Sequence, residues 1–217
     1  PTLIADGAWI EMKGGITVNE PLSLPGDAST RWSGGLRVTG GSNVWAGKIT
    51  SSPANSRIVC NAGSLDITGG ITGGQMCLGG NGGSYLRVSG APLNTPDKPF
   101  FAHTSIPIIL AMTNNAWTSL LINGNFVRTD LDNVLPPSSS LMIEAANKTG
   151  IDLNGHNQTV QKLEAPHKDG TTTILFSPTP ATLTVNQTAN TAFFASITGA
   201  VTLVKNGSGR LTLAKPC

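Results

Sequence analysis

Ala181-Thr-Leu-Thr-Val-Asn-Gln-Thr188 and Gly199-Ala-Val-Thr-Leu-Val-Lys-Asn-Gly-Ser-Gly-Arg-Leu-Thr-Leu-Ala214 are the stretches that decide the fold. In both, apolar residues alternate with small polar ones, which is the period-two pattern of a strand with one buried face. Small residues separate the strands, and the last separator is Lys205-Asn-Gly-Ser-Gly209. Because such a strand cannot bury its apolar face alone, the pattern predicts strands that stack on their neighbours.

A related unit, Gly-x-Leu-x-β-x-Gly with β a β-branched residue, recurs earlier in the chain. Its copies span 34–40, 63–69 and 84–90, the last with Ser84 in place of the first glycine. The pattern treats Leu36, Leu65 and Leu86 as equivalent positions, and likewise Leu183 and Leu211 near the C-terminus. Intervals of about 20–50 residues between copies indicate stacked repeats, so we expect about eight to ten turns of about 20–28 residues. A β-sandwich would show hairpin turns at a more even spacing, and two-residue Asn-Gly or Asp-Gly loops are not the rule here.

The C-terminal stretch also resembles a known repeat. The pattern L-x-K-x-G-x-G-x-L-x-L is the signature of the autotransporter-associated β-strand repeat of bacterial surface proteins. The residues that fall on it in order are Leu203, Lys205, Gly207, Gly209, Leu211 and Leu213. The segment 151–160 is similar to the one that often precedes this repeat. The resemblance implies an all-β, right-handed parallel β-solenoid that is secreted or displayed on a bacterial cell surface.

Composition agrees with an all-β protein and excludes several classes of function. The 217 residues include 26 glycines, and only 12% are charged. The net charge of +2, without a basic patch, predicts no nucleic-acid partner. No apolar run reaches the roughly 20 residues of a membrane helix, so no transmembrane segment is expected in this chain. The chain begins at Pro1 without Met, and we expect it to be a piece of a longer protein.

We predict one elongated domain, residues 1–217, with the C-terminal repeat unit at 181–214. A Pro-rich segment at about 91–107 carries four prolines and is expected to leave the solenoid wall as an excursion. These prolines are Pro92, Pro96, Pro99 and Pro107. Loops that leave a rigid scaffold are where binding sites are often found, so this excursion is a candidate for ligand binding.

Two of the three cysteines are candidates for a disulfide. Cys60 and Cys77 lie in short β-like runs and are separated by close to one solenoid turn. Strands about 4.8 Å apart would bring facing Cα atoms within disulfide range. Two buried thiols are the alternative, and the sequence leaves both open. Cys217 would then be unpaired or joined to a residue outside this chain.

Paired carboxylates are the first requirement of a polysaccharide hydrolase, and many such enzymes are parallel β-helices. Asp130 and Asp132 are two residues apart and could project from one strand face. Asn154-Gly-His156-Asn resembles the Gly-His element of polygalacturonases, but no Arg-Ile-Lys element follows it, and Arg57-Ile58 lies far upstream. We therefore predict no enzymatic activity and no catalytic residues, with a polysaccharide lyase or hydrolase of the pectin-lyase-like group as an alternative.

Neither a metal site nor a cofactor is expected. The histidines His103, His156 and His167 lack the close pairing of zinc ligands. Gly79-Gly-Asn-Gly-Gly-Ser84-Tyr-Leu86 resembles one calcium-binding nonapeptide of the RTX β-roll, but Ser84 replaces the aspartate ligand. We expect this run to be a Gly-rich turn between rungs.

Asparagine and tryptophan give two further expectations. Four asparagines lie in the Asn-x-Ser/Thr pattern of glycosylation acceptors, and we expect stacked Asn ladders at these positions rather than glycans. They are Asn147, Asn157, Asn186 and Asn206. The four tryptophans are expected to pack in the core or cover a solenoid end, with stacking on a ligand as the alternative. They are Trp9, Trp32, Trp45 and Trp117.

These observations favour a non-enzymatic structural segment, either a rigid stalk or a self-assembling extracellular fibre. The ends of a solenoid are open edges that must be capped or paired, so end-to-end self-association is the expected partnership. An adhesin-type module that binds a glycan or host surface is the main alternative. The sequence motifs specify a fold family, and a fold does not by itself specify a function.

Overall fold

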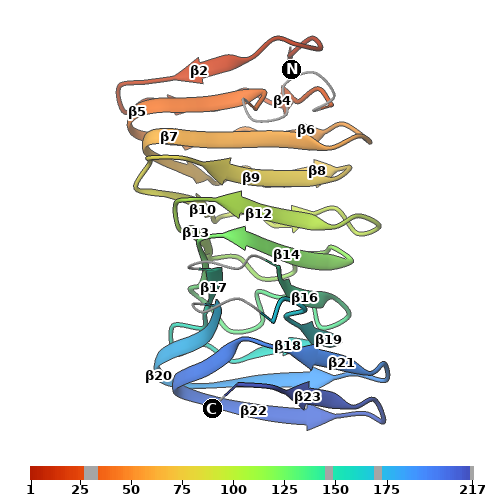
Figure 1. Cartoon of the computed structure of the whole chain (residues 1–217). Coiled ribbons are helices and arrows are strands. Elements are labelled where there is room, and N and C mark those ends of the chain that lie inside the picture. The colour runs from red at the N-terminus through yellow and green to blue at the C-terminus, as the bar shows by residue number, and fades with distance from the viewer. Residues whose placement is uncertain (27–33, 145–148, 169–172, 216–217) are drawn as a thin grey trace.

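The computed structural model describes residues 1–26, 34–144, 149–168 and 173–215. All the regular elements in these ranges are strands, and they stack in parallel as a β-solenoid of about nine turns (Figure 1). The predicted fold class is therefore confirmed, as is the single elongated domain. The two ends of the chain lie at opposite ends of the stack.

Each turn passes through up to three walls. The first wall contains β2 (Ile10–Met12), the first half of β5 (Leu36–Trp45), the first half of β7 (Ser56–Ile67), β9 (Met76–Gly80), β12 (Phe100–Thr104), β14 (Ser119–Gly124), β16 (Ser140–Ile143) and β19 (Lys162–Glu164). A parallel bridge between Ala165 and Phe193 continues this wall into the pair formed by β21 (Thr191–Phe193) and β23 (Leu211–Leu213).

The second wall follows the first after a corner. It contains β3 (Thr17–Val18), the second halves of β5 and β7, β10 (Tyr85–Val88), β13 (Ile108–Leu110), β15 (Phe126–Thr129), β17 (Thr149–Asp152), and the first halves of β20 (Thr173–Asn186) and β22 (Ser196–Asn206). The third wall begins with β1 (Thr2–Leu3), β4 (Leu22–Ser23), β6 (Ile49–Ser51), β8 (Ile71–Gly73) and β11 (Leu93–Asn94). Near the C-terminal end, β18 (Gln158–Val160) pairs with the second half of β20. The second half of β20 pairs in turn with the second half of β22.

The core is a set of apolar columns that run along the solenoid axis. In the first wall, six consecutive turns contribute one buried side chain each to a single column. Their register places in line Leu36, Ile58, Leu78, Ala102, Ile122 and Ile143. Because side chains of a strand alternate between its faces, the intervening residues point outward and are free to be polar. The period-two pattern in the sequence reports this alternation.

The register corrects the assignment of equivalent leucines. Leu65 and Leu86 are partners in the second wall, as the repeat predicts. Leu36, however, pairs with Ile58 and lies in the first wall. Near the C-terminus, Leu183 pairs with Leu203, not with an equivalent Leu211. The Gly-x-Leu-x-β unit therefore occurs on more than one wall, because long strands such as β7 bend around a corner.

That corner depends on stacked glycines. Gly41 and Gly63 have φ angles of 76° and 72°, which L-residues with side chains rarely adopt. A Cβ built on Gly63 would lie 2.0 Å from the carbonyl oxygen of Gly41. The backbones of successive turns therefore approach closely here, and neither position tolerates a side chain without a shift of the backbone.

Buried amide side chains join successive turns elsewhere. The Asn115 Oδ1 accepts the Leu93 N–H at 2.8 Å, and its Nδ2 donates to the Val134 carbonyl at 2.9 Å. Gln187 similarly accepts the Leu163 N–H at 3.4 Å and donates to the Arg210 carbonyl at 3.1 Å. Each side chain satisfies backbone groups that the turns leave unpaired, which is how buried polar groups are accommodated.

The Pro-rich segment 91–107 stays within the walls, which corrects the expectation of an excursion. β11 pairs with β8, and β12 pairs with both β9 and β14. Leu93, Phe100 and Ile106 are buried in the core. All four prolines lie outside the strands, where the missing N–H does not interrupt a ladder.

Cys60 and Cys77 do not form a disulfide; both are buried thiols. The register pairs Cys77 with Arg57, and Cys60 lies three residues beyond Arg57 along β7. An odd offset places the two side chains on opposite sides of the wall. Burial raises the pKa of the Cys60 thiol to about 11.

Of the four tryptophans, Trp45 and Trp117 are buried in the core, as predicted. The Trp117 ring centroid lies 5.2 Å from that of Phe100. Trp9 is exposed on the N-terminal turn, with the Arg37 guanidinium 3.7 Å from its ring centroid. Trp32 lies outside the described residues.

Candidate functional site

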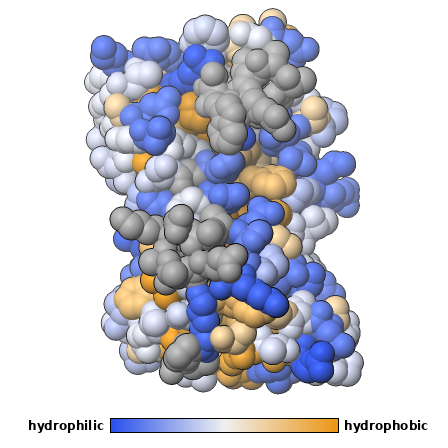
Figure 2. All heavy atoms as spheres, viewed as in Figure 1, coloured by the Kyte–Doolittle hydropathy of each residue, from blue (hydrophilic) through white to orange (hydrophobic). Residues whose placement is uncertain are grey.

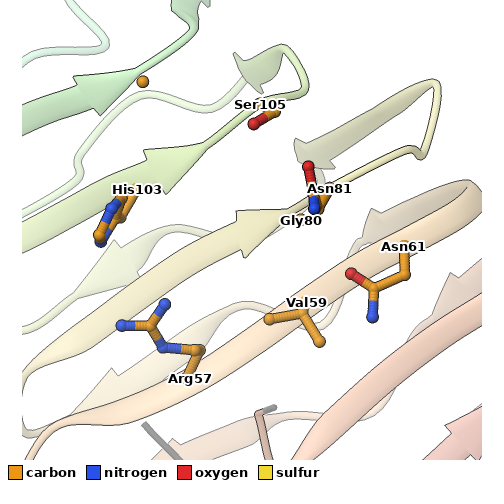
Figure 3. Close-up of a pocket in the computed structure, with 8 residues that line it drawn as sticks. Arg57, Val59, Asn61, Gly80, Asn81, His103 and Ser105 are labelled. Carbon is orange, nitrogen blue, oxygen red and sulfur yellow. The ribbon is translucent and has the colours of Figure 1, made fainter. Parts of the chain in front are cut away.

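A trough of about 600 Å³ lies on the outer surface of the first wall (Figure 3). Val59, Gly79 and His103 are register partners on β7, β9 and β12. The middle strand therefore presents glycine where the strands on either side present larger side chains. A Cβ on Gly79 would lie only 2.7 Å from the His103 carbonyl oxygen. Close packing of the backbone thus requires glycine at this position and also leaves the hollow.

Two basic side chains line the trough. Arg57 extends from β7 and His103 from β12, and Figure 3 shows the guanidinium and the imidazole on the same side of the wall, across the glycine strand. Arg57 is only 7% exposed. The pKa of His103 is lowered from its usual value by burial first and by the positive charge of Arg57 second, while Glu144 acts in the opposite direction.

Neutral polar groups form the rim. Asn61 lies near the corner within β7, Asn81 and Ser105 directly follow β9 and β12, and all three line the trough. Asn81 and Ser105 are exposed. The trough therefore combines a guanidinium and an imidazole within the wall with amide and hydroxyl groups at its edge. The Gly-rich run 79–86, predicted to be a turn between rungs, connects β9 to β10 and supplies part of this rim.

The suspected catalytic aspartates lie on the second wall. Asp130 and Asp132 follow β15 and are both engaged by hydrogen bonds. Arg128 donates to the two carboxylate oxygens of Asp130 at 2.7 and 3.1 Å, and the Asn154 amide donates at 3.1 Å. The Asp132 Oδ1 lies 3.2 Å from the His156 Nδ1 and accepts the Asn157 N–H at 2.9 Å.

The sequence thus named four residues that the structure brings into two neighbouring pairs, Asp130 with Asn154 and Asp132 with His156. What it did not indicate is Arg128, whose hydrogen bond to Asp130 is the main cause of its raised pKa. The nearby charges of Asp130 and Asp152 act in the same direction, and burial opposes them. The contacts of Asn154 with Asp130 and of His156 with Asp132 join successive turns, so the cluster links these turns together.

A smaller groove of about 300 Å³ lies beside this cluster, lined by Pro107, Phe126, Arg128, Asp152 and Phe176. The Phe126 ring lies over its register partner Gly150, where a Cβ would be 2.9 Å from the ring. A Cβ on Gly199 would similarly lie 2.9 Å from the Phe176 ring. Both rings therefore rest on glycine backbone of the next turn, and between them lie a guanidinium and a carboxylate.

The residues of the repeat motif form the last turn of the solenoid. The Lys205 ammonium donates to the carbonyls of Asn206 at 2.5 Å, Gly207 at 3.0 Å and Gln187 at 3.4 Å. Gly207 has a φ of 79°, and the Gly209 N–H donates to the Gln187 carbonyl at 3.1 Å. Leu203 and Leu211 pack against the core, whereas Leu213 is exposed. The lysine and glycines of the motif thus build one corner.

Exposed large apolar residues concentrate at the two ends of the stack. Leu3, Trp9 and Ile16 lie on the N-terminal turn, and Val204 and Leu213 lie on the C-terminal turn. Their exposed fractions range from 37% for Val204 to 75% for Leu3, and Leu131 is the one such residue in between, at 42%, within the described chain. Figure 2 shows hydrophobic residues reaching the surface near the C-terminal end.

Strand edges are also open at both ends. In the described part of the chain, β1 pairs only with β4, and β2 and β3 pair only with β5. At the other end, β22 pairs only with β20 and β23 only with β21. Each terminal turn therefore presents backbone N–H and C=O groups along one edge, next to exposed apolar side chains.

The other predicted sites give no cluster. Among residues 1–26, 34–144, 149–168 and 173–215, no three His, Cys, Asp or Glu side chains are grouped as metal ligands. His167 is exposed. Asn186 and Asn206 form the expected Asn ladder, with an amide hydrogen bond of 3.1 Å. Asn157 instead accepts the Thr182 N–H at 2.8 Å, and Asn147 lies outside the described residues.

Comparison with known proteins yields no relative: no family model, no curated protein and no solved structure matches this chain. In the described ranges, no helix has the length and apolar character needed to cross a membrane.

Proposed function

We propose that this chain is a rigid, non-enzymatic structural segment that extends by end-to-end stacking of solenoids. The observation that carries the proposal is that the first and last described turns combine strand edges paired on one side with exposed Leu3, Trp9, Val204 and Leu213. The interior of the stack, by contrast, is a continuous apolar core.

The physical basis is the cost of an exposed edge. A parallel edge offers a ready row of donors and acceptors for another strand, and apolar surface beside it gains by leaving water. A second copy placed with its N-terminal turn on the C-terminal turn of the first would continue the same parallel ladder. Such a head-to-tail contact does not close on itself, so it generates a filament.

The polar side chains of the second wall support a structural role. Asp130, Asp132 and Asn154 are held by hydrogen bonds that run between successive turns. Secretion to a bacterial cell surface is part of the proposal and rests on the resemblance of 203–213 to the autotransporter-associated repeat.

Sedimentation velocity over a wide range of concentrations tests the stacking. We expect the wild-type chain to associate as its concentration rises, and the double variant Val204→Lys, Leu213→Lys to remain monomeric, because it places two charges on the end contact. Leu131→Lys is the matched control, since Leu131 is equally exposed but lies away from both ends. A wild-type chain that stays monomeric, or a Leu131→Lys variant that dissociates as fully as the double variant, would contradict the proposal.

A second candidate is an adhesin-type module that binds a glycan, and the groove between Phe126 and Phe176 favours it. The C–H face of a pyranose can pack on an aromatic ring, while Arg128 and Asp152 offer a donor and an acceptor for hydroxyl groups. A glycan array probed with wild type and Phe176→Ala tests this function. We expect the glycans that bind to the wild type not to bind to Phe176→Ala. An array on which the wild type binds no glycan would rule out this candidate.

A further inference from the structure

The trough of the first wall is separate from both ends of the stack and from the phenylalanine groove. We propose that it binds the anionic group of a sugar-sized polar ligand, such as the carboxylate or sulfate of an acidic saccharide, between Arg57 and His103. The end-to-end stacking and this site do not depend on each other, because the trough lies on β7, β9 and β12 within the stack.

The case for an anion begins with the convergence of basic groups. Arg57 and His103 belong to strands separated by β9, and the pKa of His103 is lowered by burial first and by the positive charge of Arg57 second. The guanidinium is therefore the positive charge of the trough, and a bound anion would offset its effect on the imidazole. The planar guanidinium also presents paired N–H donors, a geometry that matches carboxylate and sulfate oxygens.

The glycine strand gives the ligand room to approach. Gly79, the register partner of Val59 and His103, carries no side chain that would cover the wall, and the neighbouring Gly80 lines the trough. The volume of about 600 Å³ falls within the range of small-ligand sites, about 300–1,000 Å³. A single inorganic anion would fill only a small part of this space, so the ligand is expected to be larger than the anion it carries.

The polar groups at the rim indicate the chemistry of the rest of the ligand. Asn61, Asn81 and Ser105 can donate to and accept from hydroxyl groups, which distinguishes this trough from an apolar groove. Val59 contributes a small apolar surface at the base. An oligosaccharide with one acidic group has this combination of hydroxyl groups, C–H surface and charge.

The Glu144 carboxylate has the same sign of charge as the proposed anion, so its position indicates where the anionic group would bind. Glu144 follows β16, and its charge raises the pKa of His103. Its N–H bonds to the carbonyl of Ile122, so it lies beyond β14, on the far side of His103 from Arg57. The anionic group is therefore expected on the Arg57 side, and removal of the Glu144 charge should strengthen binding.

Isothermal titration calorimetry with three tetrasaccharides tests the proposal: one of uronic acids, one carrying sulfate esters, and neutral maltotetraose. We expect one or both acidic probes to bind and the neutral probe to bind at least about tenfold more weakly. Binding of the uronate alone would indicate a carboxylate ligand, and binding of the sulfated probe alone a sulfate ester. Equal binding of the neutral probe, or no binding of any probe, would overturn the proposal.

Variants of equal charge then locate the site. Asn81→Asp adds a negative charge at the exposed rim and should weaken binding of the acidic probe by at least about tenfold. Asn94→Asp is the matched control, because Asn94 is exposed on β11 of the third wall. Glu144→Gln should tighten binding, and the NMR-measured pKa of His103 should rise when the probe is bound. Equal effects of the two Asn→Asp changes, or an unmoved His103 pKa, would contradict the assignment.

Discussion

Two successive turns near the C-terminus carry the same sequence pattern but have different environments. In the second half of β20, Leu183 and Val185 are fully buried. Their partners in β22 are Leu203, which is only partly buried, and Lys205, which is half-buried and donates to backbone carbonyls at the corner. The strands alternate in the same way, but the β20 segment lies between β18 and β22, whereas the β22 segment has β20 alone. In a solenoid, burial depends on having a turn on each side.

The interior and terminal turns should differ most in how much stability they lose when a glycine is replaced. Gly63→Ala would place a Cβ 2.0 Å from the Gly41 carbonyl oxygen in the interior of the stack. Gly14 has a φ of 94° on the N-terminal turn, and a Cβ there would meet nothing within 4 Å. We expect Gly63→Ala to lower the free energy of unfolding by about 3–4 kcal/mol and Gly14→Ala by about 1 kcal/mol. Equal losses in urea denaturation would show that the turns are not closely stacked at this corner.

Truncation of the paired leucines should give the next largest difference. Leu183→Ala opens a cavity in the core and is expected to lower the free energy of unfolding by about 3 kcal/mol. Leu203→Ala removes a side chain that is already partly in water, and a loss of about 1 kcal/mol is expected. Both values come from chemical denaturation at a protein concentration low enough to avoid association. A larger loss of unfolding free energy for Leu203→Ala than for Leu183→Ala would contradict this comparison, because Leu203 would then have to be the more deeply buried of the two.

The buried amide that ties the last turn to the interior should matter less. Gln187→Ala leaves the Leu163 N–H and the Arg210 carbonyl without their side-chain partner, and a loss of about 1–3 kcal/mol is expected. Asn186→Ala removes an exposed ladder contact to Asn206, and a loss below about 0.5 kcal/mol is expected. Thermal unfolding followed by circular dichroism would measure both, and equal shifts would contradict the internal role of Gln187.

The smallest effect on stability at neutral pH is expected for Cys60, whose thiol is buried in the interior. Burial raises the pKa of Cys60 to about 11 from 9.0, so the folded chain holds this proton over a range in which the unfolded chain releases it. Stability is therefore expected to be unaffected below about pH 9 and to fall as the pH rises from about 9 to 11. The variant Cys60→Ala should lose this part of the pH dependence. An unchanged slope in the variant would show that Cys60 is not the group responsible.

The alternation of apolar residues and the recurrent glycines were enough to predict the parallel solenoid and its number of turns. They could not say which wall a strand belongs to, because every wall has the same period of two. Leu36 was therefore matched with Leu65, although its partner is Ile58. For the same reason the sequence left open whether Cys60 and Cys77 form a disulfide, since a separation of about one turn does not fix the register.

The trough depends even more strongly on register. Arg57, Gly79 and His103 carry no mutual spacing signal, because the corners between their strands differ in length. Gln187 could not be identified as a buried side chain either, since amides are common on surfaces and at turns. The aspartates near 130 were easier to single out, because two carboxylates and a histidine are conspicuous in a chain with few charges.

Cryo-electron microscopy of the purified chain over a range of concentrations tests the stacking most directly. We expect short rods at low concentration and filaments at high concentration, with an axial repeat of about 4.8 Å from strand stacking. In the variant Val204→Lys, Leu213→Lys, only the rods should remain. Single rods of the wild-type chain at every concentration would contradict end-to-end extension, and compact globular particles would contradict the solenoid itself.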